Sequence, residues 1–513
     1  MNQFTFTNKE KRFSIALMIV GVVAIVWGLF TGEHSGARTW TNILHNTVFF
    51  TGIAFMSLFL LAAHTTAYAG WFTPFKRVWE SMYAFLIAGV VLIGLIVVGL
   101  WADLHHIYHW AAEGITDPNS SHYDEIIAGK AGLLNKLGFT IGTVGLVAVW
   151  WFFGKKLRAL SIEQETQGYE ITYKKIKVWA GAFLPVAGFS SFLVVLYLVM
   201  SVDPHWYSTL FAWYNAASWV VSAVAATIIL LIYLKDRGYL PNVNDSHFHD
   251  LGKYLFGFSI FWTYLWFSQY MLIWYANVGE ETVYFQYRRD HFPVLFFLNV
   301  GLNFALPLLI LIRNTSKRRM GIMAFMAGLL LFGHWIDFFL MVKPGVWHEI
   351  EAHAGHDHGD EHGHDEQHEG EQGHSDATIN YNEAKAVFTQ NHEEEQHADD
   401  GHEQQAHQEE GHAEGKAHDH GEEAHADDHD HEGHDHDEEH AAAGHDDHGH
   451  DAHGSETVFG FHLPGGVEIG TMLGFLGLFL FIFFSSLSKA GLTPKNDPYL
   501  DEGEHHNYDV QGF

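Results

Sequence analysis

The chain has 513 residues, of which 48% are hydrophobic and 17% charged, and it contains 41 Phe and 17 Trp but no cysteine. So little charge argues against a soluble globular protein of this length. The lack of cysteine excludes disulfides, thiolate-bound iron–sulfur clusters and covalently attached c-type haem. The net charge of −32 is uneven, because residues 348–456 hold 35 of the 60 Asp and Glu and 25 of the 40 His.

Ten apolar segments, each about 20 residues or longer, are long enough to cross a bilayer as helices. Runs this continuous indicate helices, because barrel strands would alternate over about 10 residues. In chain order the segments are residues 13–30, 42–69, 78–101, 132–154, 178–200, 208–234, 252–277, 292–312, 320–342 and 466–488. The sequence therefore predicts an all-α integral membrane protein with about ten transmembrane helices.

The basic residues between these segments predict the orientation. If the N-terminus is cytoplasmic, 20 of the 28 Lys and Arg fall on the cytoplasmic side, which agrees with the positive-inside rule. Both termini are then cytoplasmic in a multi-pass membrane protein; the bacterial inner membrane is what the family resemblance described below implies. No cleavable signal peptide is evident at the first apolar segment.

The composition divides the chain into three regions. Residues 1–347 form a membrane domain with nine transmembrane helices, and residues 457–513 add the tenth helix and a cytoplasmic tail. Residues 348–456 alternate His with acidic and small residues, as in "HDHEGHDHDEEH", and predict a disordered loop on the outer side of the membrane. Its imidazoles and carboxylates suit loose binding of Zn²⁺, Ni²⁺ or Cu²⁺ across residues 353–453, but no fixed ligand spacing defines a metal site.

Polar side chains in or beside the spans are the candidates for function, because lipid makes them costly. Most fall toward the predicted outer face, namely Asp103, His105, His106, Ser268, Gln269, Glu280, Glu281, His334, Asp337 and Glu468. Two fall toward the inner face, namely His64 and Glu80. The alternative is that the hydroxyl and amide groups only tie helices together and that the loop histidines are surface residues.

Helical spacing sorts some of these candidates. His334 and Asp337 are i, i+3 neighbours inside a span, and an imidazole beside a carboxylate can exchange protons near neutral pH. Tyr264, Ser268 and Tyr275 fall on one helical stripe, apart from Gln269. No pair of intramembrane histidines at matching depth favours a b-type haem.

A long aromatic stretch and five shorter ones carry a family resemblance. The long one, residues 249–285, reads "HDLGKYLFGFSIFWTYLWFSQYMLIWYANVGEETVYF", and the others are residues 70–82, 105–110, 203–214, 333–345 and 467–502. They resemble the second polysulfide-reductase-like (NrfD-like) membrane subunit of alternative complex III, a bacterial quinol:cytochrome c oxidoreductase. Residues 348–456 depart from that family, in which a much shorter loop joins the last two helices.

The resemblance implies two four-helix bundles plus two further helices, and a subunit without a covalently bound cofactor. It implies quinol or quinone, such as menaquinone, as the substrate of the complex, with haem and iron–sulfur clusters on partner subunits. Those partners are a polytopic sister subunit, multihaem cytochrome c subunits, an iron–sulfur subunit, and cytochrome c or a terminal oxidase; no nucleic acid is implied. By matching motif, Asp103, His105, Ser268, Gln269, Glu280, Glu281, His334, Asp337 and Glu468 become candidates for a quinone-site neighbourhood or a proton path.

Two other functions stay open at this stage, and no complete active site is expected in this chain alone. One is a structural membrane anchor for peripheral haem and iron–sulfur subunits. The other is a metal or ion transporter whose His-rich loop collects metal. Transporters commonly contain broken helices near the membrane midplane, and the long seventh segment disfavours that class.

Overall fold

The computed structural model describes residues 3–32, 34–167, 169–357, 458 and 460–507. Among these residues there are helices and turns but no strand, apart from an isolated bridge between Gln3 and Gly491. The chain divides into two units, Met1–Glu366 with Thr457–Phe513, and Gln367–Glu456. The second unit lies outside the described residues, and so do the predicted disorder and metal binding of the His-rich loop beyond residue 357.

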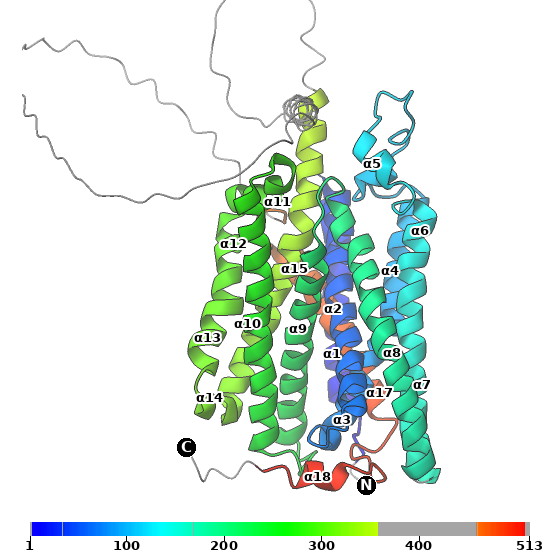
Figure 1. The fold of residues 1–513 in the computed structure, drawn as a ribbon, viewed down its shortest axis with the longest axis vertical. Helices are drawn as coiled ribbons and strands as arrows, with labels where there is room; N and C mark the ends of the chain where they lie inside the picture. The colour runs from blue at the N-terminus through cyan, green and yellow to red at the C-terminus, as the bar shows by residue number, and fades with distance from the viewer. Residues whose placement is uncertain (1–2, 33, 168, 358–457, 459, 508–513) are drawn as a thin grey trace, which may run out of the picture. The chain divides into compact units, whose positions relative to one another are not determined.

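The described part of the first unit is a bundle of long helices (Figure 1). The α-helices are α1 (Asn8–Phe30), α2 (Ser35–Thr66), α3 (Lys76–Met82), α4 (Leu86–Trp101), α5 (Glu125–Lys130), α6 (Lys136–Thr140), α7 (Leu146–Gln167), α8 (Tyr169–Leu198), α9 (Thr209–Asp236), α10 (Asp245–Ala276), α11 (Gly279–His291), α12 (Pro293–Val300), α13 (Leu306–Leu311), α14 (Asn314–Arg318), α15 (Met320–Asp357), α17 (Gly466–Leu487) and α18 (Leu500–Glu504). Short 3₁₀ or π turns are η1 (Thr73–Phe75), η2 (Tyr83–Phe85), η3 (His109–Ala111), η4 (Ile141–Gly145), η5 (Met200–Val202) and η6 (Gly301–Ala305).

Within the described residues, nine helical segments are long and apolar enough to cross a membrane. They match nine of the ten predicted segments. The remaining one, predicted at residues 252–277, is the 32-residue helix α10, which packs beside α9 (Figure 1). Its Trp, Tyr, Ser and Gln residues make it less apolar than the other nine. The prediction of an all-α polytopic membrane protein is confirmed.

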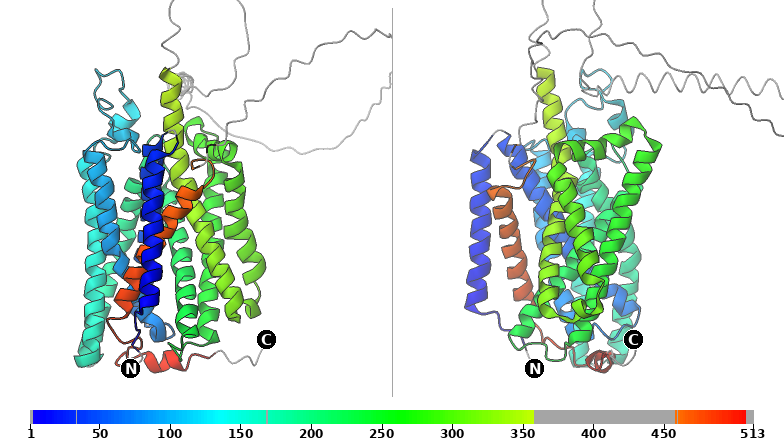
Figure 2. Two further views of the ribbon diagram at one scale, coloured as in Figure 1. Left: turned by 180° about the vertical axis from the view of Figure 1, so that it is seen from behind. Right: turned by 90° about the vertical axis from the view of Figure 1, so that its left-hand side faces the viewer.

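The two ends of the described chain lie at the same end of the bundle. Gln3 donates a hydrogen bond of 2.6 Å from its amide to the carbonyl of Ser488, and α18 packs against η1. We call this end, which also holds Lys76 and Arg77, the terminal end, and the opposite end, with residues 102–135 and 203–208, the loop end (Figure 2). A chain whose two ends lie on the same side of a membrane must cross that membrane an even number of times. Helix α10, added to the nine apolar segments, gives ten crossings.

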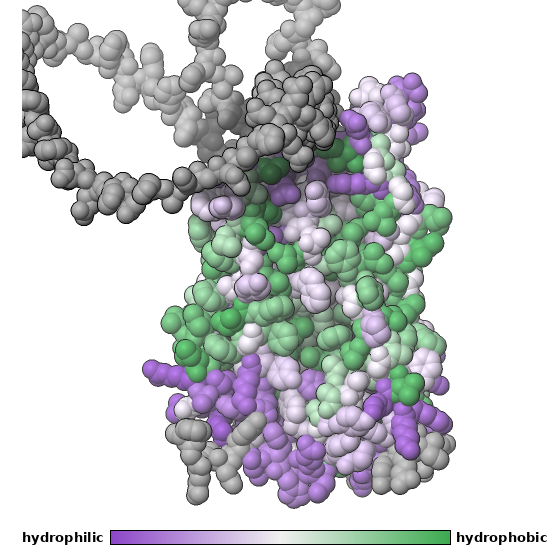
Figure 3. All heavy atoms as spheres, viewed as in Figure 1, coloured by the Kyte–Doolittle hydropathy of each residue, from purple (hydrophilic) through white to green (hydrophobic). Residues whose placement is uncertain are grey.

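The centre of the bundle is formed by α2 and α9. Their most apolar stretches are 89% and 83% buried inside the protein, whereas that of α1 is 22% buried. On the face that Figure 3 shows, an apolar belt lies between two polar ends, as a membrane-embedded protein requires.

Helix α1 lies at the edge of the bundle and pairs with α17, far away in sequence (Figure 2). Glycines allow the contact, because a Cβ on Gly21 would lie 2.3 Å from the Cα of Gly474. Gly470 and Gly474 follow the small-xxx-small spacing that lets membrane helices approach closely.

Several predicted segments differ in detail from the observed helices, since η2 lies within residues 78–101 and η4 within residues 132–154. The segment at residues 292–312 is interrupted by the π turn η6 between α12 and α13. Helix α15 contains Pro344 and continues to Asp357, so the predicted boundary at residue 347 falls within a helix.

Candidate functional site

Asp337 lies at the centre of a buried hydrogen-bond network between four helices. The side chain, on α15, is 0% exposed. The Tyr214 hydroxyl of α9 donates to its Oδ1, and so does the Asn299 amide of α12 at 2.8 Å. The Trp262 indole of α10 donates to Oδ2 at 2.9 Å. Three neutral donors from three helices therefore converge on one carboxylate, and no Lys or Arg among the described residues forms an ion pair with it.

His334 is the ionisable neighbour of this carboxylate. One turn before Asp337 and equally buried, its Nδ1 lies 3.7 Å from Asp337 Oδ2 and 2.8 Å from the hydroxyl of Ser218 on α9. Its Nε2 has no hydrogen-bond partner in the described part of the chain. An imidazole beside a carboxylate without a fixed countercharge can take up and release protons.

The local sequence explains how Asn299 is held toward Asp337. The Asn303 amide, on the π turn η6, donates at 2.6 Å to the Asn299 Oδ1, which leaves the Asn299 NH₂ to face the carboxylate. Asn303 fits because the facing residue of α15 is Gly333, where a Cβ would lie 2.3 Å from the Asn303 Oδ1. Single π turns inside α-helices often occur at functional sites.

A narrow cavity continues from this network toward the loop end. Its lining residues are Tyr214, Trp266, Gln269, Tyr284, Phe285, Arg288, Phe296, Asn299, Leu340 and Met341. It has room for about one water molecule. Gln269 is 2% exposed, and its Nε2 has no hydrogen-bond partner within the described residues. Gln269 is thus the one predicted candidate that the structure brings to the same cavity as the donors of Asp337.

Arg288 joins this cavity to the loop end. Pro344 has no backbone N–H and cannot bond the carbonyl of Leu340, which instead accepts a hydrogen bond of 2.9 Å from the Arg288 Nε. Arg288 also pairs with Asp203 at 2.8 Å, and its guanidinium lies over the Tyr284 ring at 3.3 Å. Burial raises the pKa of Tyr284 above its usual range, so this phenol stays protonated.

The remaining outer candidates on residues 103–106 do not reach Asp337. Asp103 and His106 form a loose pair of 3.7 Å between side chains that are 76% and 79% exposed. His105 is buried, with its ring 4.8 Å from that of Trp40, and its Nε2 lies 2.9 Å from the Ile96 carbonyl. Burial lowers the pKa of His105 and favours the neutral imidazole.

The candidates at and after α10 also lie apart from Asp337. Glu280 and Glu281 occupy the first turn of α11, beyond the left-handed Asn277 that ends α10, and Glu280 is exposed. Ser268 is half-buried on the outward side of α10, in the stripe that contains Tyr264 and Tyr275, whereas Gln269 points inward. The helical spacing predicts this separation.

Glu468 belongs to a separate ion pair between α2 and α17. The Arg38 guanidinium binds both of its carboxylate oxygens at 2.8 Å, the Asn42 amide donates at 2.9 Å and the Gly465 N–H at 2.9 Å. The guanidinium that binds both oxygens of this buried carboxylate indicates a fixed structural anion.

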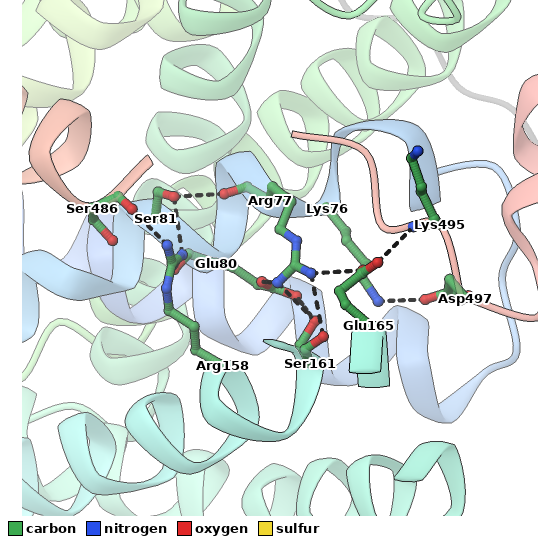
Figure 4. Close-up of polar contacts among 10 residues, drawn as sticks. All are labelled: Lys76, Arg77, Glu80, Ser81, Arg158, Ser161, Glu165, Ser486, Lys495 and Asp497. Carbon is green, nitrogen blue, oxygen red and sulfur yellow. Dashed lines mark hydrogen bonds and ion pairs between the residues drawn. The ribbon is translucent and has the colours of Figure 1, made fainter. Parts of the chain in front are cut away.

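At the terminal end, Glu80 lies in a cluster of charged side chains (Figure 4). It accepts hydrogen bonds of 2.6 Å from Arg77 and from the hydroxyl of Ser161, and Arg158 donates at 2.6 Å to its backbone carbonyl. A small cavity beside it has room for about one water molecule and is bordered by Asp497 of the C-terminal segment.

His64 lies near the same end but in another cluster. Its Nδ1 is 2.8 Å from the Leu60 carbonyl and its Nε2 3.0 Å from the Tyr254 hydroxyl. The two inner candidates thus occur at one end of the bundle without contacting one another directly.

Reasoning from the sequence missed Tyr214, Ser218, Trp262, Arg288 and Asn299. Asn299 and Asn303 carried a usable signal, because two amides at i, i+4 inside an apolar span are costly in lipid. Tyr214, Ser218 and Ser222 form a second signal, a row of hydroxyls at i, i+4 and i+8 along α9. Nothing in the local sequence pairs Trp262 with Asp337.

A scan against protein-family models gives no match to this chain, and a search of curated proteins finds no relative.

Proposed function

We propose that the chain is a membrane subunit of a respiratory quinol:cytochrome c oxidoreductase of the alternative complex III type, and that it contributes a proton path. The proposal combines the resemblance of residues 249–285 and 333–345 with the buried network to which those two stretches contribute. In this proposal haem and iron–sulfur clusters lie on partner subunits. The terminal end faces the bacterial cytoplasm and the loop end faces the periplasm.

The observation that carries the proton role is the environment of Asp337. A carboxylate in a membrane span is expensive, and structural ones are normally paired with Arg or Lys. Asp337 instead has three neutral donors and the imidazole of His334. The neutral donors support the carboxylate but supply no fixed positive charge, and the neighbouring imidazole is a group that can accept and return a proton.

The size of the neighbouring cavity favours protons over quinone within this chain. Its space beside Gln269 and Asn299 suits about one water molecule, and a quinone ring is much larger. We therefore assign the quinol ring to a partner subunit. Protons leave Asp337 toward Gln269 and the pair of Arg288 and Asp203 at the loop end, with Arg288 acting as a fixed charge.

The test is Asp337→Asn in the assembled complex, with Asp103→Asn as the matched control. Both variants make the same chemical change, but Asp103 is exposed and makes only a loose pair with His106. We expect Asp337→Asn to slow quinol:cytochrome c turnover by roughly tenfold or more, because proton transfer groups contribute at least that much. Asp103→Asn should retain wild-type turnover.

Assembly is measured alongside turnover, by retention of the haem-bearing subunits on purification. If assembled Asp337→Asn turned over and released protons at the wild-type rate, the proton role would be refuted. If this chain, purified alone, catalysed metal-dependent flux in vesicles, the whole assignment to an oxidoreductase would fail in favour of a transporter.

A further inference from the structure

The outward side of α10 differs from an ordinary lipid-facing surface. Its outward stripe includes the exposed side chains Phe261, Tyr264, Phe267, Met271, Leu272 and Tyr275, with Ser268 half-buried beside Tyr264. Tyr264 is 63% exposed and Tyr275 84%. In Figure 3 paler spheres interrupt the green apolar belt in its middle part, over the region where Figure 1 draws α10.

The hydroxyls of Tyr264 and Ser268 lie near the middle of the membrane-spanning part of α10, where contact with lipid alone is unfavourable. The apolar part of α10 runs from Leu255 to Ala276, and Tyr264 and Ser268 lie on either side of its middle. A belt of Tyr and Trp at the membrane surface accounts for Tyr275 and Trp274, close to the end of the helix, but not for groups at the midplane. No residue that the structure describes forms a hydrogen bond with the side-chain hydroxyl of Tyr264 or Ser268.

The edge helix α1 supplies the contrast. Its outward side chains from Phe13 to Val26, among them Ile15, Ile19 and Val22, are all hydrocarbon, and its exposed Trp27 lies in the last turn of the helix. Lipid solvates such a surface, whereas hydrocarbon offers a hydroxyl no hydrogen-bond partner. Tyr, Trp and Met are also the side chains enriched at the centres of protein–protein interfaces.

We infer that the outward stripe of α10 is an interface for a transmembrane helix of a separate membrane protein, one that presents hydrogen-bond acceptors at mid-membrane depth to Tyr264 and Ser268. Interhelical hydrogen bonds of this kind assist association in lipid, where apolar burial gives little driving force. The inference requires only that the chain spans a membrane, so it does not depend on the proposed oxidoreductase. It also gives Ser268 a role in assembly, apart from that of Gln269.

The decisive experiment places the photo-crosslinker p-benzoylphenylalanine at position 264 in the full chain, in native membranes. The control places it at Phe189, which is 80% exposed on α8. We expect a protein adduct from position 264 whose linked peptide is a membrane-spanning segment of a different chain, and at least about fivefold less protein adduct from position 189. A linked peptide from a second copy of this chain, or only lipid or quinone adducts at position 264, would overturn the inference.

Removing the hydroxyls tests the chemistry of the contact. The double variant Tyr264→Phe/Ser268→Ala keeps the outward shape and should weaken retention of the crosslinked partner in detergent by roughly fivefold. The control is Ser191→Ala on α8, whose hydroxyl bonds its own helix at the Gly188 carbonyl and should not affect retention. Unchanged retention in the double variant would contradict the role of the two hydroxyls.

Discussion

Asp337 and Glu80 are both buried carboxylates on membrane helices, but they are stabilised in different ways. Glu80 is bound by the guanidinium of Arg77, with Arg158 on its backbone carbonyl. Asp337 receives hydrogen bonds only from neutral groups, beside one imidazole. A guanidinium carries a fixed positive charge, whereas an imidazole is a side chain that can gain or lose a proton. Burial is therefore common to both carboxylates, and the charge of their neighbours is what distinguishes them.

The largest effect on stability is expected at the Glu80 cluster. Arg77→Met leaves a buried carboxylate without its ion pair and should lower the free energy of unfolding by about 3–5 kcal/mol. Thermal unfolding of the purified protein measures this, with Arg289→Met as control, because Arg289 pairs with Asp290 on the surface. Turnover per assembled complex should stay near wild type. A loss of turnover as large as that of Asp337→Asn would abolish the distinction between the two carboxylates.

An intermediate effect on stability is expected from the donors of Asp337. Asp337→Asn places an NH₂ group where one carboxylate oxygen stood, so a donor such as the Trp262 indole loses its acceptor at a cost of about 1–3 kcal/mol. Trp262→Phe removes that indole N–H. The double variant Asp337→Asn/Trp262→Phe should therefore lose less free energy of unfolding than the two single variants lose together. A double-mutant cycle measures this difference. Strict additivity would show that the indole does not support the carboxylate.

The smallest effect concerns a buried histidine without a carboxylate partner. Burial lowers the pKa of His105 in the folded protein, so folding favours the neutral imidazole. The contribution of His105 to the free energy of unfolding is therefore fully present above the unfolded pKa of about 6.5 and is lost as the pH falls below that value. His105→Gln should reduce the loss of stability between pH 7.5 and 5.5 by about 1 kcal/mol or less. His106→Gln, at an exposed neighbour, is the control for the exchange of His for Gln.

The sequence predicted the membrane helices well, because length and continuous apolarity are local properties. It also identified His334 and Asp337 as neighbours, since i, i+3 spacing is a property of one helix. The donors of Asp337 could not be inferred in the same way, because Tyr214, Trp262 and Asn299 come from three other helices. Their convergence depends on how the bundle packs, and a single sequence contains no direct signal for that packing.

Depth along a helix was also a poor guide to which candidates act together. Asp103, Glu280 and Glu468 share the predicted outer level with Asp337. The structure gives them a surface loop, a surface turn and a separate ion pair. The angular position of a residue around the helix axis decides which side chains face one another. Gln269 and Ser268 are adjacent in sequence, but Gln269 faces the interior and Ser268 the outward surface.

The pairing of α1 with α17 has a consequence for biosynthesis. The ribosome must make 435 further residues after Phe30 before Gly466 begins the helix that Gly21 will contact. At the usual rates of translation this takes roughly 20–90 s. During that interval the inserted α1 has no α17 to pack against and must be held by lipid or by the insertion machinery. The membrane domain thus completes its edge only after the acidic His-rich segment has been translated.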